Sequence, residues 1–198
     1  MNDAHPRVGI TAAAAHLPEQ VITTAELQHR VERASALRLP PGLFETMSGI
    51  THRHVVGPGE YASTLATRAA EEALRQAGLD PLDVDLLLFA SATRDVAEPA
   101  TAHIVQADLG SRAHALDVTN ACNSFVNGID LARTMIVAGR ADRVLVATGE
   151  TPSRAMRPRL DSLNQARDAF AGYTFGDAGA AVVVERVDRG GIFDIDTE

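Results

Sequence analysis

The chain has 198 residues, of which 45% are hydrophobic and only 4% aromatic, and its formal net charge is −8 with a pI near 5.3. A chain of this length can bury a real core and fits one large domain or a piece of a larger protein. Because the composition is acidic and lacks a basic stripe, we expect no binding to nucleic acid.

The single cysteine, Cys122, excludes an internal disulfide and a zinc cage made of cysteines. Residues 1–6 are polar and do not resemble a signal peptide, and no apolar run is long enough to span a membrane. The sequence also lacks a His-x-x-x-His pair and an acidic cluster that would predict a metal site. We therefore expect a cytoplasmic protein without a membrane span or a bound metal.

Apolar periodicity and turn residues predict alternating strands and helices. The spacing of Thr23 and Glu26 is that of a capping box, which predicts a helix start, and Pro40-Pro41-Gly42 would end that helix. The expected elements, in chain order, are a strand over 8–17, a helix from Thr23 to Pro40, an irregular strand over 49–56, a helix over 61–77 stopped by Gly78, a strand over 84–90, a helix over 99–109, and a strand over 113–118. A helix over 122–139, a strand over 143–149, a polar and basic loop over 150–172 and a strand over 178–187 follow.

Two of these elements carry further information. Residues 84–90 form a near-continuous apolar run, which predicts a central parallel strand that is covered on both faces. Pro99 suits the first position of the helix that ends at Gly110. The order of elements indicates an α/β layered fold with a mostly parallel sheet.

Cys122 lies between a predicted strand and a helix that carries few charges and should be buried nearly all round. A thiol at a helix start faces unpaired backbone N–H groups and the positive end of the helix dipole, which favour the thiolate nucleophile. The alternative is a small buried hydrophobic side chain, which is common for a free cysteine. Position alone leaves both interpretations open.

Several ordered motifs around Cys122 resemble those of the thiolase superfamily and, within it, of the β-ketoacyl-[acyl-carrier-protein] synthase III group. They are Asp117-Val118-x-x-Ala121-Cys122 with Gly128, Ala138-Gly139-x-x-Asp142-Arg143-Val144-Leu145-Val146, and Phe175-Gly176-Asp177-Ala178-Gly179-Ala180-Ala181-Val182-Val183. Gly49-Ile50 with Arg53, and Pro99 to Gly110, fit the same group upstream. The resemblance covers essentially the whole chain.

The resemblance implies a thiolase-like half with a mostly parallel mixed sheet, which is half of a five-layer αβαβα sandwich. Residues 1–198 would form the N-terminal thiolase-like domain. The family's histidine and asparagine belong to a C-terminal half that this chain does not contain. We therefore expect a homodimer or a completing C-terminal half as a partner.

The chemistry implied by the resemblance is acyl transfer followed by Claisen condensation. Cys122 would accept an acyl group from acyl-CoA or acyl-carrier protein and condense it with a second thioester, in fatty-acid, polyketide or long-chain olefin or β-ketoacid biosynthesis. Coenzyme A thioesters would be substrates, with no permanently bound cofactor. The alternatives are an acyl-accepting or structural half-subunit that needs another chain, and acyl transfer to an oxygen or nitrogen nucleophile without condensation.

A second feature is found in residues 94–102 together with 118–122. These residues resemble the thiolase-like enzymes that join two fatty acyl-CoAs in olefin biosynthesis more than they resemble the housekeeping enzymes that initiate fatty-acid synthesis. In that subfamily a glutamate at the place of Glu98 reaches the cysteine of the partner subunit and acts as base. Carried over, Glu98 would deprotonate the α-carbon of the second acyl-CoA, a role that needs a carboxylate in a desolvated pocket. The alternative is a solvated loop acid before Pro99.

The resemblance implies that the usual contact with coenzyme A is altered or absent in this sequence. The synthase III group stacks the adenine on a tryptophan, with an arginine nearby. This chain has no Trp, and those places hold Leu43 or Phe44 and Met47. Arg154 and Arg157 are the candidates for binding the coenzyme A phosphates. An exposed, solvated loop is the alternative interpretation of this basic stretch.

Overall fold

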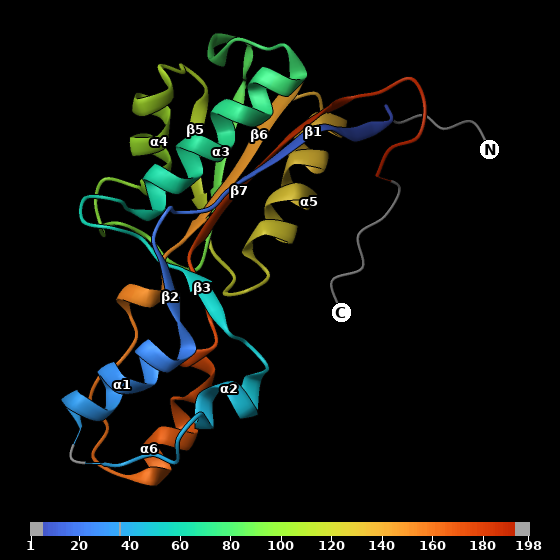
Figure 1. Ribbon diagram of the computed structural model, residues 1–198. Helices are drawn as coiled ribbons and strands as arrows, with labels where there is room; N and C mark the ends of the chain where they lie inside the picture. The colour runs from blue at the N-terminus through green and yellow to red at the C-terminus, as the bar shows by residue number, and fades with distance from the viewer. Residues whose placement is uncertain (1–5, 36, 193–198) are drawn as a thin grey trace. The chain divides into compact units, whose positions relative to one another are not determined.

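The computed structural model describes residues 6–35 and 37–192, so residues 1–5 of the predicted polar N-terminus lie outside the described part (Figure 1). Its strands are β1 (Val8–His16), β2 (Val21–Thr23), β3 (His52–His54), β4 (Leu86–Ala90), β5 (His114–Val118), β6 (Arg143–Glu150) and β7 (Ala178–Arg186). Its α-helices are α1 (Thr24–Ala34), α2 (Leu43–Ser48), α3 (Ala62–Ala77), α4 (Thr101–Leu109), α5 (Ser124–Val137) and α6 (Leu163–Asp168). Short 3₁₀ helices are η1 (Pro81–Asp83), η2 (Pro152–Arg154) and η3 (Phe170–Tyr173).

The chain divides into two compact units, which we call the sheet unit and the small unit. The sheet unit comprises Met1–His16, Tyr61–Glu150 and Gly179–Glu198. The small unit comprises Leu17–Glu60 and Thr151–Ala178.

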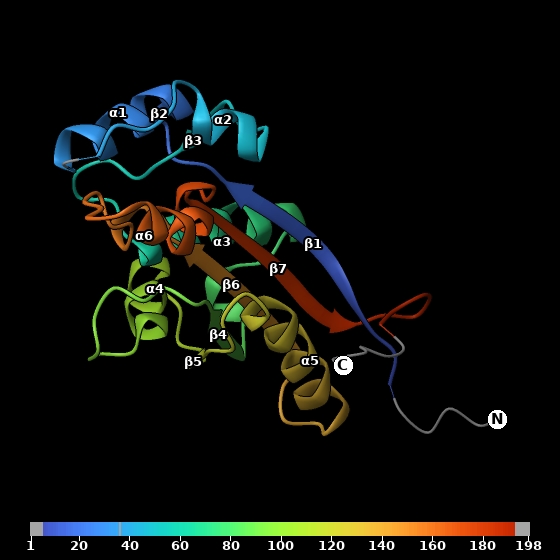
Figure 2. The same cartoon turned by 90° about the horizontal axis from the view of Figure 1, so that it is seen from below.

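The sheet unit is built on a five-stranded sheet with the order β1-β7-β6-β4-β5. Strand β4 runs parallel to both β5 and β6, whereas β1 runs antiparallel to β7, as the adjacent arrows in Figure 2 show. The predicted mostly parallel mixed sheet is therefore confirmed. Strand β4 is fully buried, as its apolar run predicted, although β6 and not β4 occupies the middle of the sheet.

Helices cover both faces of this sheet. On one face, Leu87 and Phe89 of β4 pack with buried residues of α3 and α4. On the other face, Leu86 and Leu88 of the same strand pack with α5. Strand β4 alternates its apolar side chains between two cores, which explains why it has no polar face.

Helix α4 begins later than predicted. Its first residue is Thr101, so the expectation that Pro99 occupies the first helical position is wrong. The reason is a cap supplied from a neighbouring strand: the Asp117 carboxylate of β5 accepts the N–H groups of Thr101 at 3.1 Å and Ala102 at 2.7 Å. A carboxylate there also matches the positive end of the helix dipole.

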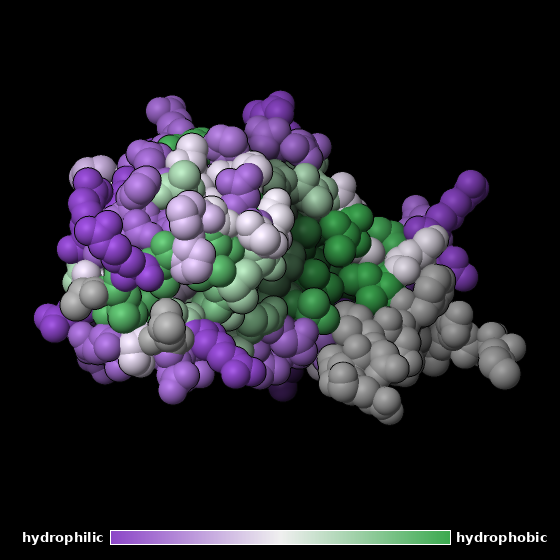
Figure 3. Space-filling view, turned by 60° about the horizontal axis from the view of Figure 1, so that its bottom comes forward, coloured by the Kyte–Doolittle hydropathy of each residue, from purple (hydrophilic) through white to green (hydrophobic). Residues whose placement is uncertain are grey.

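Helix α5 packs closely on the sheet through Gly128. A Cβ atom at this position would lie 2.8 Å from both the Ala90 Cβ and the Val146 Cγ1 atoms. The prediction that this helix is buried nearly all round is wrong for the described chain, because Val126 is 40% exposed and several further apolar side chains are only half-buried. Figure 3 shows apolar side chains, in green, gathered on one face of the molecule. None of the helices among the described residues is long and apolar enough to cross a membrane.

The small unit contains the β2–β3 pair and three short helices. The predicted capping box is confirmed: the Thr23 hydroxyl accepts the Glu26 N–H at 3.0 Å, and the Glu26 carboxylate accepts the Thr23 N–H at 3.1 Å. Helix α1 ends at Ala34, however, so the expectation that it continues to Pro40 is wrong. Ser35 is extended and its hydroxyl accepts the Leu160 N–H at 2.8 Å, which draws the chain out of the helix.

Two stretches of the small unit are more ordered than predicted. Helix α2 was missed; it lies between Gly42 and Gly49, which both have a left-handed backbone. Residues 150–172 were predicted as a loop but contain η2, α6 and most of η3. The apolar residues in these stretches share one core, in which the rings of Phe44 and Tyr173 stack at 4.8 Å.

Candidate active site

Cys122 lies in a tight turn between β5 and α5, two residues before the first residue of the helix. Cys122 is exposed among the described residues, which favours a reactive thiol over a small buried hydrophobic side chain. The predicted position at the start of an apolar helix is confirmed to within two residues.

Backbone geometry fixes the turn that carries Cys122. Ala121 has φ = 46°, a left-handed conformation that costs about 1–2 kcal/mol for a residue other than glycine. The Ser124 hydroxyl, in a side chain that is 2% exposed, donates to the Ala121 carbonyl at 2.7 Å and accepts the Asn120 N–H at 2.8 Å. These bonds hold the strained residue directly before the thiol.

The N–H groups that follow Cys122 are already used inside the turn. The Asn123 N–H donates to the Asn120 carbonyl at 3.0 Å, and the Ser124 N–H donates to the Ala121 carbonyl at 3.2 Å. The unpaired N–H groups that the sequence predicted at this helix start are therefore not those of Asn123 and Ser124. The side-chain amide of Asn120 also donates to the Asn127 Oδ1 at 2.6 Å, which ties the turn to the first turn of α5.

Glu98 lies on the loop 91–100 between β4 and α4 and is exposed, together with Val96 and Pro99. Asp95 anchors this loop: its carboxylate accepts the Ser63 N–H at 3.2 Å, and its own N–H donates to the Thr101 hydroxyl at 3.3 Å. Within this chain the structure does not place Glu98 in the desolvated pocket that a base requires. Residues 96–99 instead form an exposed tip on an anchored loop.

Sequence reasoning missed Glu150, the last residue of β6. Its carboxylate accepts hydrogen bonds from Ser91, Ala92 and Thr93, at the start of the loop that carries Glu98. An acid directly after the end of the predicted strand over 143–149 was the available signal, because functional groups gather at the carboxyl ends of parallel strands.

The two predicted arginines lie in the small unit and differ in their surroundings. Arg154 is exposed, and its guanidinium donates to the Glu60 carbonyl. Arg157 lines a pocket of about 500 Å³ together with Arg159 and Tyr173. The Tyr173 hydroxyl donates to the Arg157 carbonyl at 2.8 Å, and burial raises the pKa of this tyrosine.

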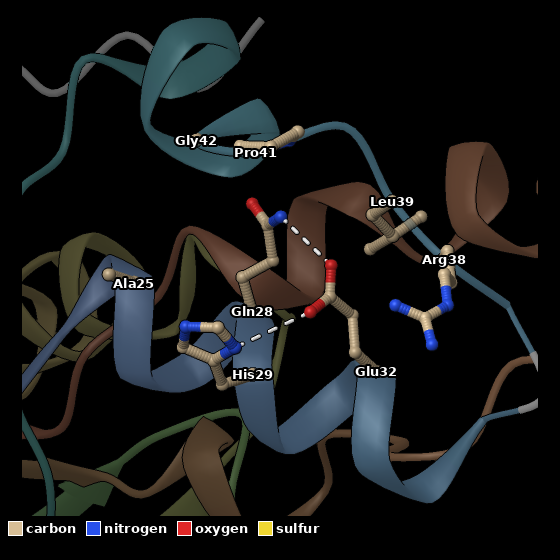
Figure 4. A pocket seen from close by; sticks show the side chains of 8 residues that line it. All are labelled: Ala25, Gln28, His29, Glu32, Arg38, Leu39, Pro41 and Gly42. Carbon is tan, nitrogen blue, oxygen red and sulfur yellow. Dashed lines mark hydrogen bonds and ion pairs between the residues drawn. The ribbon is translucent and has the colours of Figure 1, made fainter.

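A second pocket of the small unit, of about 260 Å³, lies between α1 and the segment 38–42 (Figure 4). The Gln28 side-chain amide donates to the Glu32 Oε1 at 3.2 Å, and the His29 Nδ1 lies 3.4 Å from the Glu32 Oε2. No predicted site residue lines this pocket.

Among the described residues there is also no group of three or more His, Cys, Asp and Glu that could hold a metal ion.

Comparisons with known proteins show which family the chain resembles. The family model for 3-oxoacyl-[acyl-carrier-protein] synthase III matches residues 116–198. The β-ketoacyl-[acyl-carrier-protein] synthase III of Cereibacter sphaeroides is 37% identical over 186 residues, which cover 93% of this chain and 53% of that protein. The protein of the same name from Caldanaerobacter subterraneus is 33% identical and covers 92% of this chain and 51% of its own length.

Solved structures show the same similarity. Xanthomonas campestris OleA bound to cerulenin has a TM-score of 0.81 and 30% identity, covering 93% of this chain and 58% of that chain. The 3-oxoacyl-[acyl-carrier-protein] synthase III of Aquifex aeolicus has a TM-score of 0.76 and 32% identity, covering 92% and 55%. The chain thus spans about half the length of the curated relatives it matches. The predicted resemblance to the β-ketoacyl-[acyl-carrier-protein] synthase III group and the thiolase-like α/β fold are confirmed.

Proposed function

We propose that this chain forms the acyl-accepting half of a synthase III-type condensing enzyme, with Cys122 as the nucleophile. The observation that carries the proposal is the exposed Cys122 thiol in a hydrogen-bonded turn directly before α5. A thiolate held in a fixed turn loses little further freedom when it attacks a carbonyl, which favours catalysis.

In the first step the Cys122 thiolate attacks the carbonyl carbon of an acyl thioester. The tetrahedral oxyanion collapses, the new bond to Sγ is kept, and coenzyme A or the carrier protein leaves as its thiolate. Backbone N–H groups other than those of Asn123 and Ser124 would stabilise the oxyanion, because these two already donate within the turn.

In the second step Glu98 acts as the base. It removes a proton from the α-carbon of a second acyl thioester, and the resulting carbanion attacks the carbonyl carbon of the acyl group on Cys122. A β-ketoacyl thioester forms, and Cys122 leaves as the thiolate. The exposure of residues 96–99 supports the proposal that Glu98 acts at the Cys122 of a second copy of the chain. The interface between the two copies would then desolvate the Glu98 carboxylate.

Coenzyme A thioesters are the proposed donors, with acyl-carrier protein as the other possible carrier. A structure of an OleA variant, which is 30% identical to this chain with a TM-score of 0.79, contains lauric acid and lauroyl-CoA. Arg157, in the pocket it shares with Arg159, is the better placed of the two predicted arginines for a phosphate group, because Arg154 already donates to Glu60.

The half-length match supports the proposal that residues 1–198 form the first of two similar domains. The half-buried apolar side chains of α5, with Val126 exposed, would be covered by the second domain. That domain would supply the histidine and asparagine expected for condensation.

Product analysis tests the proposed reaction. The chain, combined with a completing second half, is incubated with two acyl-CoAs of different length, and the products are identified by mass spectrometry. Release of a β-ketoacyl product supports condensation. An acyl group that stays on Cys122 supports the half-subunit alternative, and transfer to an added amine or alcohol supports acyl transfer without condensation.

A further inference from the structure

Three polar side chains, Ser91, Thr119 and Glu150, meet where β4, β5 and β6 end. Each follows or ends one of three adjacent strands that run in parallel. They therefore lie at the same edge of the sheet as the loop of Glu98 and the turn of Cys122.

Glu150 uses both carboxylate oxygens. Oε1 accepts the Ala92 N–H at 2.6 Å and the Ser91 hydroxyl at 2.8 Å. Oε2 accepts the Thr93 N–H at 3.1 Å and the Thr93 hydroxyl at 2.7 Å. All four donors belong to the first three residues of the loop that carries Glu98. A glutamine has a single acceptor oxygen and could satisfy only one side of this arrangement.

Ser91 links the same loop to the turn of Cys122. Its N–H donates to the Val118 carbonyl at 3.1 Å, and its carbonyl accepts the Thr119 hydroxyl at 3.1 Å. The Ser91 side chain is 3% exposed, so water does not compete for these bonds. A continuous path of hydrogen bonds therefore leads from Glu150 through Ser91 to Thr119, three residues before Cys122.

The backbone before Glu150 is also fixed. A Cβ atom on Gly149 would lie 1.8 Å from the Ala62 carbonyl oxygen, so the end of β6 is pressed against the start of α3. Only glycine allows this approach. Glu150 is thus a rigid support, and the loop and the turn are the parts that it holds.

We propose that Glu150 is a positioning residue that couples the loop of Glu98 to the turn of Cys122. This inference rests on the proposed function, in which both segments must keep a defined geometry during acyl transfer. Glu150 itself touches neither substrate nor thiol in this role.

The test uses Glu150→Gln in the full chain, with Glu72→Gln as the matched control, since Glu72 also accepts side-chain hydrogen bonds but on the exposed surface of α3. Amide hydrogen exchange is expected to quicken about tenfold at Ala92 and Thr93 and also at Asn120, with the amides of α3 unchanged. The saturating rate of Cys122 acylation by an acyl-CoA is expected to fall about tenfold, with little change in the half-saturating concentration.

A double-mutant cycle separates coupling from general destabilisation. Thr119→Val removes the hydroxyl that binds Ser91, so the double variant with Glu150→Gln should acylate no more slowly than Glu150→Gln alone. The proposal would be overturned if the two substitutions slowed acylation by independent factors that multiply in the double variant. Faster amide exchange confined to Ala92 and Thr93 would also overturn it. If the unmodified chain takes no acyl group, the proposed function fails, and the exchange at Asn120 still decides whether Glu150 couples the two segments.

Discussion

At the scale of single residues, the reactivity expected of Cys122 depends on its neighbours in the turn. Ala121 adopts a left-handed backbone, and the buried Ser124 hydroxyl bonds to both Asn120 and Ala121. The energy of these bonds offsets the strain at Ala121, since each contributes about 1 kcal/mol. The thiol is therefore presented by a turn that does not need to reorganise.

Glu98→Gln separates the two proposed steps. The variant should acylate Cys122 at the normal rate but form condensed product about 100-fold more slowly, because a general base typically contributes a factor of that order. Acylation is followed by the intact mass of the protein, and condensation by product release in the presence of a completing second half. Glu19→Gln, at another exposed acid, is the control. Equal loss of both steps in Glu98→Gln would contradict the role as base.

Sequence reasoning located some site residues and missed others for a physical reason. Cys122 is unique, and its strand-to-helix context is local, so the sequence predicts its position. Glu150 and Ser91 are 59 residues apart and meet only because parallel pairing brings the ends of β4 and β6 together. No local pattern predicts that contact.

At the scale of elements, local signals explain which helices and strands were predicted. Three predicted features depend only on residues that are close in sequence. They are the capping box at the start of α1, the glycine with a left-handed backbone after α3, and the apolar run of β4. Helices α2 and α6 have six residues each, too few to show apolar periodicity, and their region is stabilised by long-range packing around Phe44 and Tyr173.

Gly128→Ala should destabilise the sheet unit. The added methyl group would meet the Ala90 and Val146 side chains at 2.8 Å, and overpacking of this kind costs about 1–3 kcal/mol. Urea denaturation measures the free energy of unfolding. Gly172→Ala is the control, because apart from its own chain neighbours no heavy atom lies within 4 Å of a Cβ there. An equal effect of the two substitutions would contradict close packing of α5.

Tyr173 makes stability dependent on pH in the alkaline range. Burial raises the pKa of its phenol above the ordinary value of 10.0, so the folded state holds the proton more tightly than the unfolded state. This stabilisation is fully present below about pH 10 and is lost as the pH rises through the raised pKa.

Tyr173→Phe should weaken that alkaline loss of stability and cost about 1 kcal/mol at neutral pH, through the lost hydrogen bond to the Arg157 carbonyl. Denaturant titrations from about pH 7 to pH 11 provide the measurement. The other tyrosine, Tyr61, is 47% exposed, and Tyr61→Phe serves as control. An unchanged pH profile in Tyr173→Phe would show that another group titrates.

At the scale of the whole molecule, the chain carries apolar surface that a single copy leaves partly uncovered. Helix α5 contacts the sheet through one side, while Phe125, Ile129 and Met135 remain half-buried. We predict that the purified chain is not a stable monomer, because such surface promotes association. Light scattering over a range of concentrations checks this, and a monodisperse monomer throughout would contradict it.

Intact-protein mass spectrometry after incubation with lauroyl-CoA tests whether Cys122 accepts an acyl group. We predict a mass increase of one lauroyl group, located on Cys122 by peptide mapping, absent from Cys122→Ala and reversed by hydroxylamine, which cleaves thioesters. An unmodified Cys122, or equal acylation of the Cys122→Ala variant, would show that Cys122 is not the acyl acceptor.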